Sequence, residues 1–244
     1  MTSTPTAVGR RTRTGPTPHA VLLDMDGTLV DTEGVWWDAE VEVFASLGHH
    51  LTDEHRTVVA GGPMSRSATY LIDVTGADIT LEDVSVLIDA AFLNRIERGV
   101  TLMPGARRLL TELVVHRVPT ALVSASHRPV VERMLRALGP ENFEITVAGD
   151  DLARSKPHPD PYLTAAGLLG AAPLHCVTVE DTATGVASAE AAGCQVVVVP
   201  SVNPIRPAPG RTVVDSLEQV DLPFLRSLPP PPSRTAGALR PATA

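Results

Sequence analysis

Five short, mostly apolar runs that alternate with helical segments constrain the fold of this chain more than any other feature of its sequence. The expected strands are residues 20–23, 120–123, 144–147, 175–179 and 195–199. The helical patterns that separate the later strands are residues 106–116, 129–138, 161–169 and 184–192. Apolar strands that alternate with helices predict a parallel sheet with helices on both faces, because both faces must then be covered. Right-handed crossovers make this an α/β, doubly wound, Rossmann-like domain.

A segment without an expected strand interrupts the alternation directly after the first strand. Residues 32–100 carry helical patterns at 33–47, 53–60, 65–74 and 81–96. We therefore expect a core domain made of residues 19–31 and 101–227, with an all-helical cap domain, residues 32–100, inserted into it. The ends of the chain, residues 1–18 and the proline-rich residues 228–244, are expected to be a disordered arm and a disordered tail.

The charge and composition of the chain exclude several classes of function. A formal net charge of -8 argues against a nucleic-acid partner or an anionic membrane surface, because both need a basic face. No apolar run approaches the roughly 20 residues that cross a bilayer. Two cysteines do not make a disulfide framework, which fits a reducing cytoplasm. Nothing in the pattern requires a second subunit, so we expect a monomer.

Reactive side chains follow four of the five expected strands. They are Asp24 and Asp26, Ser124, Lys156, and Glu180 with Asp181. Lys156 is the only lysine of the chain, which otherwise uses arginine for its cations, and a compact ammonium is therefore expected there for a purpose. Because ligands of open α/β sheets bind at the carboxyl ends of the strands, these side chains are expected to meet in one site.

Taken singly, each of these positions has a plainer interpretation. An Asp-Gly pair after a strand is a common turn, and Ser124 could cap the helix that begins near residue 129. Glu180 and Asp181 could likewise cap the helix that follows them, and Lys156 could be a solvated charge. Their occurrence in one chain, in this order, favours the site.

The same positions carry a family resemblance. Residues 24–31 (Asp-Met-Asp-Gly-Thr-Leu-Val-Asp) resemble the first motif of the haloacid dehalogenase superfamily in its phosphatase form. Residues 123–126, 156–161 and 180–185 resemble the second, third and fourth motifs. The resemblance covers roughly residues 20–200, and the helical insert resembles the cap of the subgroup that contains sugar-phosphate phosphatases and beta-phosphoglucomutase.

The resemblance implies a phosphoryl transfer in two steps. Asp24 would be the nucleophile and form an aspartyl phosphate, which divides one slow hydrolysis into two easier steps. Asp26 would protonate the leaving oxygen and then deprotonate the attacking water. The dehalogenases that name the superfamily lack this second aspartate, so Asp26 favours phosphate chemistry.

The resemblance also implies a Mg²⁺ cofactor. Asp24, the main-chain carbonyl of Asp26 and Asp181 would bind the ion, and Glu180 would support it through water. Lys156 would bridge Asp24 and a phosphate oxygen.

The substrate is expected to be a small phosphorylated metabolite. Ser124 would donate a hydrogen bond to its phosphate, and Gly27 and Thr28 would offer backbone donors. The complete set of expected substrate contacts is Gly27, Thr28, Ser124, Ala125, Lys156, Glu33, Trp36, Arg66 and His127, of which the cap residues rest on position alone.

Two alternatives to a phosphatase can be compared with the sequence, a phosphomutase and a binding protein without activity. Beta-phosphoglucomutase is similar over the whole chain, but its cap histidine corresponds to Trp36 and a lysine after its second motif corresponds to His127. Both departures favour a phosphatase over a mutase. A binding protein on an inactive scaffold has no support, because no motif residue is missing.

Overall fold

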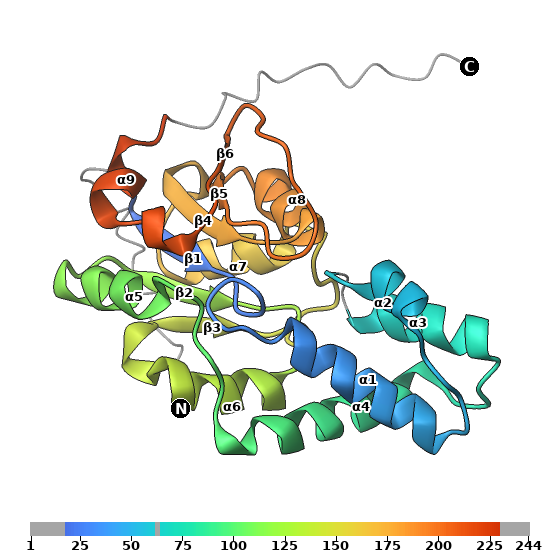
Figure 1. The fold of residues 1–244 in the computed structure, drawn as a ribbon. Coiled ribbons are helices and arrows are strands. Elements are labelled where there is room, and N and C mark those ends of the chain that lie inside the picture. The colour runs from blue at the N-terminus through green and yellow to red at the C-terminus, as the bar shows by residue number, and fades with distance from the viewer. Residues whose placement is uncertain (1–17, 62–63, 230–244) are drawn as a thin grey trace, which may run out of the picture.

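The computed structural model of the chain describes residues 18–61 and 64–229. Its centre is a six-stranded sheet in the order β3-β2-β1-β4-β5-β6, and every neighbouring pair is parallel (Figure 1). The strands are β1 (Ala20–Leu23), β2 (Thr120–Val123), β3 (Ile145–Val147), β4 (Cys176–Glu180), β5 (Gln195–Val198) and β6 (Arg211–Val213). The predicted α/β, doubly wound fold with a helical insert is confirmed.

Helices cover both faces of the sheet, as the apolar strands require. The core helices are α5 (Ala106–Val115), α6 (Arg128–Leu138), α7 (Asp160–Leu168), α8 (Ala183–Ala192) and α9 (Leu222–Ser227). Val21 and Leu23 of β1 belong to the hydrophobic cluster formed with α5, α6 and α9, whereas Ala20 and Leu22 belong to the cluster formed with α7 and α8. This alternation follows from the two-residue period of a strand.

The order of the strands reverses at β1. β1 pairs with β2 on one side and with β4 on the other, so the chain leaves β1 in opposite directions along the sheet. Such a switch point opens a crevice at the carboxyl ends of the strands. Asp24, which directly follows β1, therefore lies where a ligand is expected.

Four helices form a separate lobe beside the carboxyl edge of the sheet (Figure 1). They are α1 (Glu33–Ser46), α2 (Asp53–Val59), α3 (Met64–Thr75) and α4 (Leu81–Arg95). The two linkers to the core run antiparallel: Asp31 N donates to Thr101 O over 2.9 Å, and Met103 N donates to Leu29 O over 2.9 Å. We propose that this helical cap domain spans residues 32–100, as the sequence predicts.

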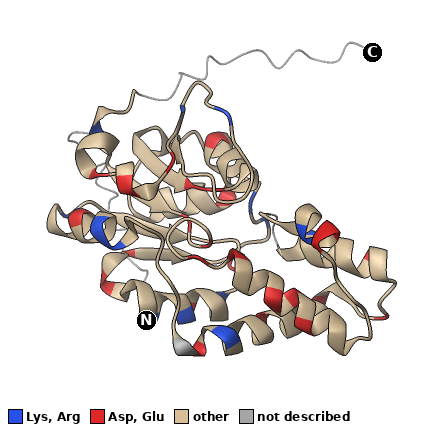
Figure 2. Cartoon of the chain, in the orientation of Figure 1, with Lys and Arg blue, Asp and Glu red and all other residues tan. Residues whose placement is uncertain are grey.

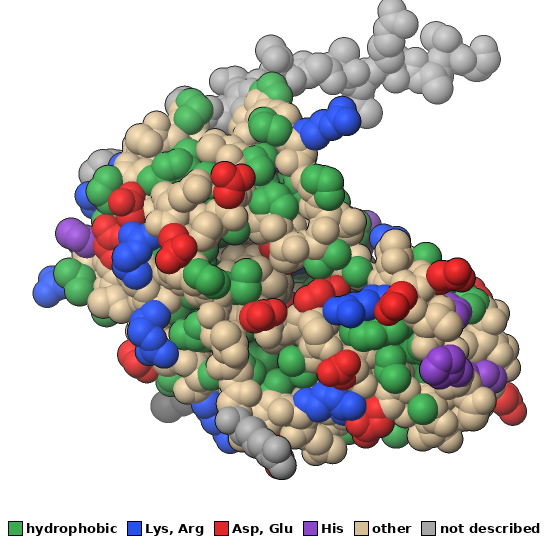
Figure 3. Space-filling view, in the orientation of Figure 1, with side chains coloured by type: hydrophobic (Ala, Val, Ile, Leu, Met, Phe, Trp, Pro, Cys, Tyr) green, Lys and Arg blue, Asp and Glu red, His purple; other side chains and the backbone are tan. Residues whose placement is uncertain are grey.

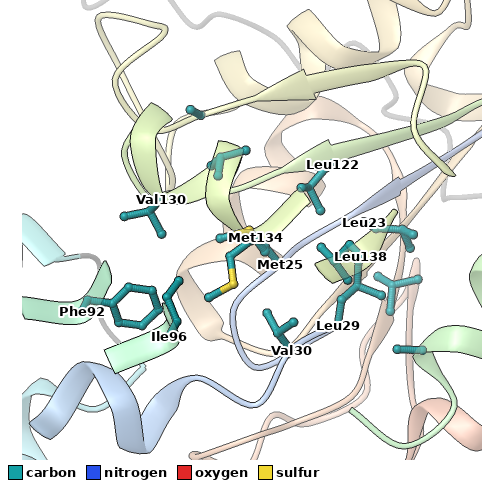
Figure 4. Packing of buried hydrophobic residues seen from close by; sticks show 14 of the residues in the cluster. Leu23, Met25, Leu29, Val30, Phe92, Ile96, Leu122, Val130, Met134 and Leu138 are labelled. Atoms are coloured by element: carbon teal, nitrogen blue, oxygen red, sulfur yellow. The ribbon is translucent and has the colours of Figure 1, made fainter. Parts of the chain in front are cut away.

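The base of the helical lobe continues the hydrophobic core. Phe92 and Ile96 belong to the same buried cluster as Val130 and Met134 of α6 (Figure 4). Apolar contact therefore holds the α4 side of the lobe on α6 of the core.

Among the strands and α-helices of the described residues, β6 and α9 were not predicted. β6 contains Arg211 and Thr212 and is half-buried, so it lacks the apolar run by which the other strands were found. α9 is six residues long and begins after Asp221, whose carboxylate accepts a hydrogen bond from Phe224 N over 2.7 Å.

The predicted disordered ends need a small correction. Pro18 is buried, and Leu228 packs against the core cluster, so the ordered chain is slightly longer than predicted at both ends. The remainder of the two predicted segments, residues 1–17 and 230–244, lies outside the described residues.

Acidic and basic residues are interspersed on the helices of both the core and the lobe (Figure 2). In the part of the chain that the structure describes, no helix has the length and hydrophobicity of a bilayer span.

Candidate active site

Lys156 lies at the centre of the predicted site and is 6 % exposed. Its Nζ donates to Asp24 Oδ1 over 2.6 Å, to Glu180 Oε1 over 2.6 Å and to Val123 O over 2.8 Å. Burial lowers the pKa of Lys156, but the charges of Asp24 and Glu180 outweigh burial and hold it above its usual value. The three acceptors use all three protons of the ammonium, so a phosphate oxygen would have to replace one of them.

Asp24 follows β1 and is buried beside this ammonium. Its main-chain N–H donates to Val179 O over 3.0 Å, which fixes the residue against β4. Burial is the main cause that raises the pKa of Asp24 to about 7, and the charge of Lys156 opposes it. Asp24 therefore depends on nearby positive charge to remain ionised near neutral pH.

Glu180 anchors the floor of the site and is fully buried. Its Oε1 accepts hydrogen bonds from Lys156 and from the Tyr162 hydroxyl, the latter over 2.5 Å. Its Oε2 accepts from Asp181 N over 3.2 Å and from Thr182 Oγ1 over 3.4 Å. Both carboxylate oxygens are thus engaged by the protein.

The close approach of α8 to Glu180 requires a glycine. A Cβ on Gly185 would lie 1.9 Å from Glu180 Oε1, far inside contact distance. Gly185 therefore allows the first turn of α8 to close over this carboxylate.

Asp181 is the second buried carboxylate beside Asp24. Its Oδ2 accepts a hydrogen bond from Ser201 Oγ over 2.5 Å, and its Oδ1 accepts from Thr28 Oγ1 over 3.3 Å. Burial, reinforced by the charges of Asp24 and Glu180, raises the pKa of Asp181 well above its usual value.

The predicted backbone donors to phosphate lie in the loop after β1. Gly27 has a φ of 77°, and a Cβ there would lie 2.1 Å from Asp181 Oδ2, so only glycine fits. The Gly27 N–H donates to Val30 O over 2.8 Å. This hydrogen bond competes with the predicted donation from Gly27 to a phosphate. Thr28 is buried, and its hydroxyl contacts Asp181.

These acids fit a divalent metal ion. Carboxylate oxygens of Asp24, Glu180 and Asp181 lie within 4.8 Å of one another, and Lys156 is the only cation paired with this group among the described residues. Three buried carboxylates against one ammonium leave excess negative charge. Oxygen ligands of this kind suit Mg²⁺.

Asp26 receives four hydrogen bonds. Thr32 Oγ1 donates to its Oδ1 over 2.8 Å and Trp36 Nε1 donates to the same oxygen over 3.1 Å. Ser126 Oγ and Ser124 Oγ donate to its Oδ2 over 2.8 Å and 3.3 Å. The carboxylate is thus held by the linker, the helical lobe and the loop after β2 together.

A cavity of about 110 Å³ separates this floor from the helical lobe. Of the predicted site residues, seven line it: Asp24, Asp26, Glu33, Trp36, Ala125, Lys156 and Asp181. Ser124, Gly27, Thr28 and Glu180 do not line it but contact residues that do. The space-filling view shows a hollow with acidic side chains near it at the boundary between the two lobes (Figure 3).

Two predicted substrate contacts lie elsewhere. His127 Nδ1 lies 2.6 Å from Asp89 Oδ2 of α4, so the ring joins the core to the lobe outside the cavity. Arg66 is exposed and lines an adjoining cavity of about 170 Å³ with Val202 and Asn203.

Several residues of the site were not predicted. Ser126, Tyr162 and Ser201 bind the carboxylates from below or beside the cavity, and Arg56 and Glu40 line its lobe side. For Ser126 a signal was present, because it lies two residues after Ser124. For Glu40 the signal was its helical spacing from Glu33 and Trp36. For Tyr162, Ser201 and Arg56 the sequence offers no local signal, because their contacts depend on how distant elements pack.

Comparison with known proteins agrees with this geometry. The family model for haloacid dehalogenase-like hydrolases matches residues 21–199. Hexitol phosphatase A of Escherichia coli (strain K12) is 34% identical over 217 residues, which cover 82% of this chain and 91% of that protein. The bifunctional riboflavin kinase/FMN phosphatase of Arabidopsis thaliana is 31% identical over 183 residues, 74% of this chain, but the match spans only 48% of its length.

A solved structure extends the likeness to three dimensions. CbbY from Rhodobacter sphaeroides in complex with phosphate superimposes with a TM-score of 0.75 at 28% identity, over 85% of this chain and 98% of that chain. The family match, the fold and the buried carboxylate–lysine group lead to one conclusion. The chain belongs to the haloacid dehalogenase-like hydrolases and is an enzyme of their phosphatase type.

Proposed function

We propose that this protein is a Mg²⁺-dependent phosphatase that hydrolyses a small sugar or polyol phosphomonoester through an aspartyl phosphate on Asp24. The observation that carries the proposal is the contact of Asp24 Oδ1 with Lys156 Nζ at 2.6 Å, beside Asp181 and on the floor of a cavity. A carboxylate nucleophile, a fixed cation and metal-ligating oxygens are the parts that phosphoryl transfer requires.

In the first step a carboxylate oxygen of Asp24 attacks the phosphorus atom. A bond forms between this oxygen and phosphorus while the bond between phosphorus and the ester oxygen breaks. The proton of Asp26 passes to the ester oxygen, which leaves as the alcohol. Asp26 lines the same cavity as Asp24, as this transfer requires.

In the second step water attacks the phosphorus of the aspartyl phosphate. Asp26 takes the proton of the water, the bond between phosphorus and Asp24 breaks, and inorganic phosphate leaves. Glu180 and Val123 O hold the Lys156 ammonium in place during both steps. Its positive charge therefore stabilises the Asp24 carboxylate when the second step regenerates it.

Asp24 and Asp181 would hold the metal ion, with Glu180 behind them. Bound there, Mg²⁺ supplies positive charge to the phosphate oxygens. We propose Glu180 as the residue that fixes Lys156 and Asp181, since both of its oxygens already accept hydrogen bonds.

The substrate class rests on the relatives and on the size of the cavity. The name of the relative hexitol phosphatase A indicates that that protein acts on a phosphorylated polyol, and a cavity of about 110 Å³ suits a small ester. Ala125, Glu33 and Trp36 line this cavity and are the proposed contacts; the backbone of Gly27 and Thr28, Ser124, Arg66 and His127 stay predictions.

A panel of phosphomonoesters tests the proposal. Purified protein with D-glucitol 6-phosphate and Mg²⁺ should release inorganic phosphate, and excess EDTA should abolish the release. Equal release with and without EDTA would contradict the metal requirement. Incubation with beta-glucose 1-phosphate tests the mutase alternative, and glucose 6-phosphate formed ahead of free phosphate would favour it.

A further inference from the structure

Glu40 carries a buried carboxyl group that has no hydrogen-bond or ion-pair partner among the described residues. It lies on α1, is 6 % exposed and lines the cavity above the catalytic floor. Within residues 18–61 and 64–229 no hydrogen bond or ion pair reaches its side chain. Its carboxyl oxygens are not among the fully buried polar atoms that lack a partner, so they are open to the cavity, where a bound molecule can reach them.

The helical period brings Glu40 to the cavity. Glu33, Trp36, Trp37 and Glu40 stand at positions i, i+3, i+4 and i+7 of α1, which is one face of a helix, and all four line the cavity. Glu40 is about 10 Å farther along the helix from the linker than Glu33, from the rise per residue. The nucleophile, in contrast, lies on the core side.

The surroundings of Glu40 offer it no counter-charge. Arg56, the cation on this wall of the cavity, lies over the Trp37 ring, 5.9 Å from its centroid. Burial, reinforced by the charge of Glu33, raises the pKa of Glu40 to about 8. Near neutral pH the group is therefore largely a neutral acid that can donate one hydrogen bond and accept others.

We propose that Glu40 is a specificity-determining residue that hydrogen-bonds a hydroxyl group of a polyhydroxylated phosphomonoester, at the end of the substrate remote from its phosphate. A hydroxyl satisfies this carboxyl as both donor and acceptor. A second anionic group at that place, a carboxylate or a further phosphate, would be disfavoured by the charge of Glu33. This inference rests on the proposed phosphatase function.

Two substrates that differ only in their hydroxyl groups test the proposal. The measured quantity is the ratio of kcat/KM for D-glucitol 6-phosphate to kcat/KM for hexyl phosphate. Glu40→Ala should lower this ratio by about 3- to 10-fold, the worth of a hydrogen bond between neutral groups. Glu40→Gln, which still donates and accepts, should restore a large part of it.

Glu42→Gln is the matched control. Glu42 lies on the same helix but is exposed and pairs with Arg95, so this variant should leave the ratio as in wild type. An unchanged ratio in Glu40→Ala would overturn the proposal. So would a wild type that prefers fructose 1,6-bisphosphate and loses this preference in Arg56→Ala, because the cavity would then select a second anion.

The outcome separates this inference from the proposed function. If wild type hydrolyses neither ester, the proposed function fails. If wild type hydrolyses both and Glu40→Ala lowers both kcat/KM values equally, the role of Glu40 is structural and the present inference alone is wrong.

Discussion

The indole N–H of Trp36 donates a hydrogen bond to Asp26 Oδ1 over 3.1 Å, so a side chain of the helical lobe holds the proposed acid and base of the core. The same indole stacks on Phe92 of α4, with ring centroids 3.8 Å apart and an angle of 15° between the planes. Trp36 thus joins the packing of the lobe to the position of a reacting carboxyl group.

This contact also decides which oxygen of Asp26 can carry a proton. An indole N–H only donates, so Oδ1 must accept from it. The donors to Oδ2 are the hydroxyls of Ser124 and Ser126, which can turn to accept instead. In the acid role proposed for Asp26, the proton therefore resides on Oδ2.

Trp36→Phe removes this donor and keeps an aromatic ring for stacking. We expect kcat for D-glucitol 6-phosphate to fall by about 10-fold, since a hydrogen bond to a charged group has roughly this worth, while the melting temperature changes little. Steady-state kinetics and thermal unfolding measure the two quantities. Trp37→Phe, which removes no hydrogen bond to Asp26, should have a smaller effect on kcat, and equal losses in the two variants would contradict the assigned role.

The substitution Gly185→Ala should displace the Glu180 carboxylate of the site. Because the added Cβ would lie 1.9 Å from Glu180 Oε1, the carboxylate must move and release Lys156. We expect Gly185→Ala to lower the free energy of unfolding by about 1–3 kcal/mol and to reduce kcat. Gly34→Ala is the control: nothing lies within 4 Å of its Cβ position, so it should be neutral or stabilise α1 by up to about 1 kcal/mol.

The buried Glu40 should make the protein less stable as pH rises. Its pKa is raised from 4.5 to about 8 by burial and by Glu33, so the folded protein binds a proton that the unfolded chain releases above about pH 4.5. Stability is therefore lost between these two values, in total by up to a few kcal/mol. Urea unfolding measures the free energy of unfolding of Glu40→Gln and of wild type at each pH. The value of the variant minus that of wild type should be larger at about pH 9 than at about pH 5. A difference that does not change with pH, or the same change in Glu42→Gln, would refute this source of pH dependence.

Asp181 should be needed for the metal ion apart from any catalysis. Mg²⁺ at about 100 times its Kd stabilises a protein that binds it by about 2.7 kcal/mol, so the wild-type melting temperature should rise on addition of Mg²⁺. Asp181→Asn should lose this rise, whereas Asp38→Asn, at an exposed position of α1, should keep it. A rise that persists in Asp181→Asn would place the ion elsewhere.

The sequence predicted those features that follow from local patterns. β1 and β2 were predicted at their observed bounds, because all of their residues except Thr120 are apolar. The edge strand β6 and the six-residue α9 were missed, because neither has an apolar run of its own.

The contacts between the lobe and the core could not be predicted from the sequence. His127 meets Asp89, 38 residues away, and Trp36 meets Asp26, because of the way α1 and α4 lie on the core. No periodicity in the insert specifies this placement. Glu40 was missed although Glu33 and Trp36, both predicted substrate contacts, stand seven and four residues before it on the same face of α1.

Isolation of the phosphorylated enzyme tests the central claim most directly. After rapid mixing of wild type with Mg²⁺ and substrate followed by an acid quench, mass spectrometry should find a phosphoryl group on Asp24. Asp24→Asn should carry no such group and should lose activity by at least about 1,000-fold. A phosphoryl group on another residue, or an Asp24→Asn variant that releases phosphate at the wild-type rate, would contradict the assignment of Asp24 as the nucleophile.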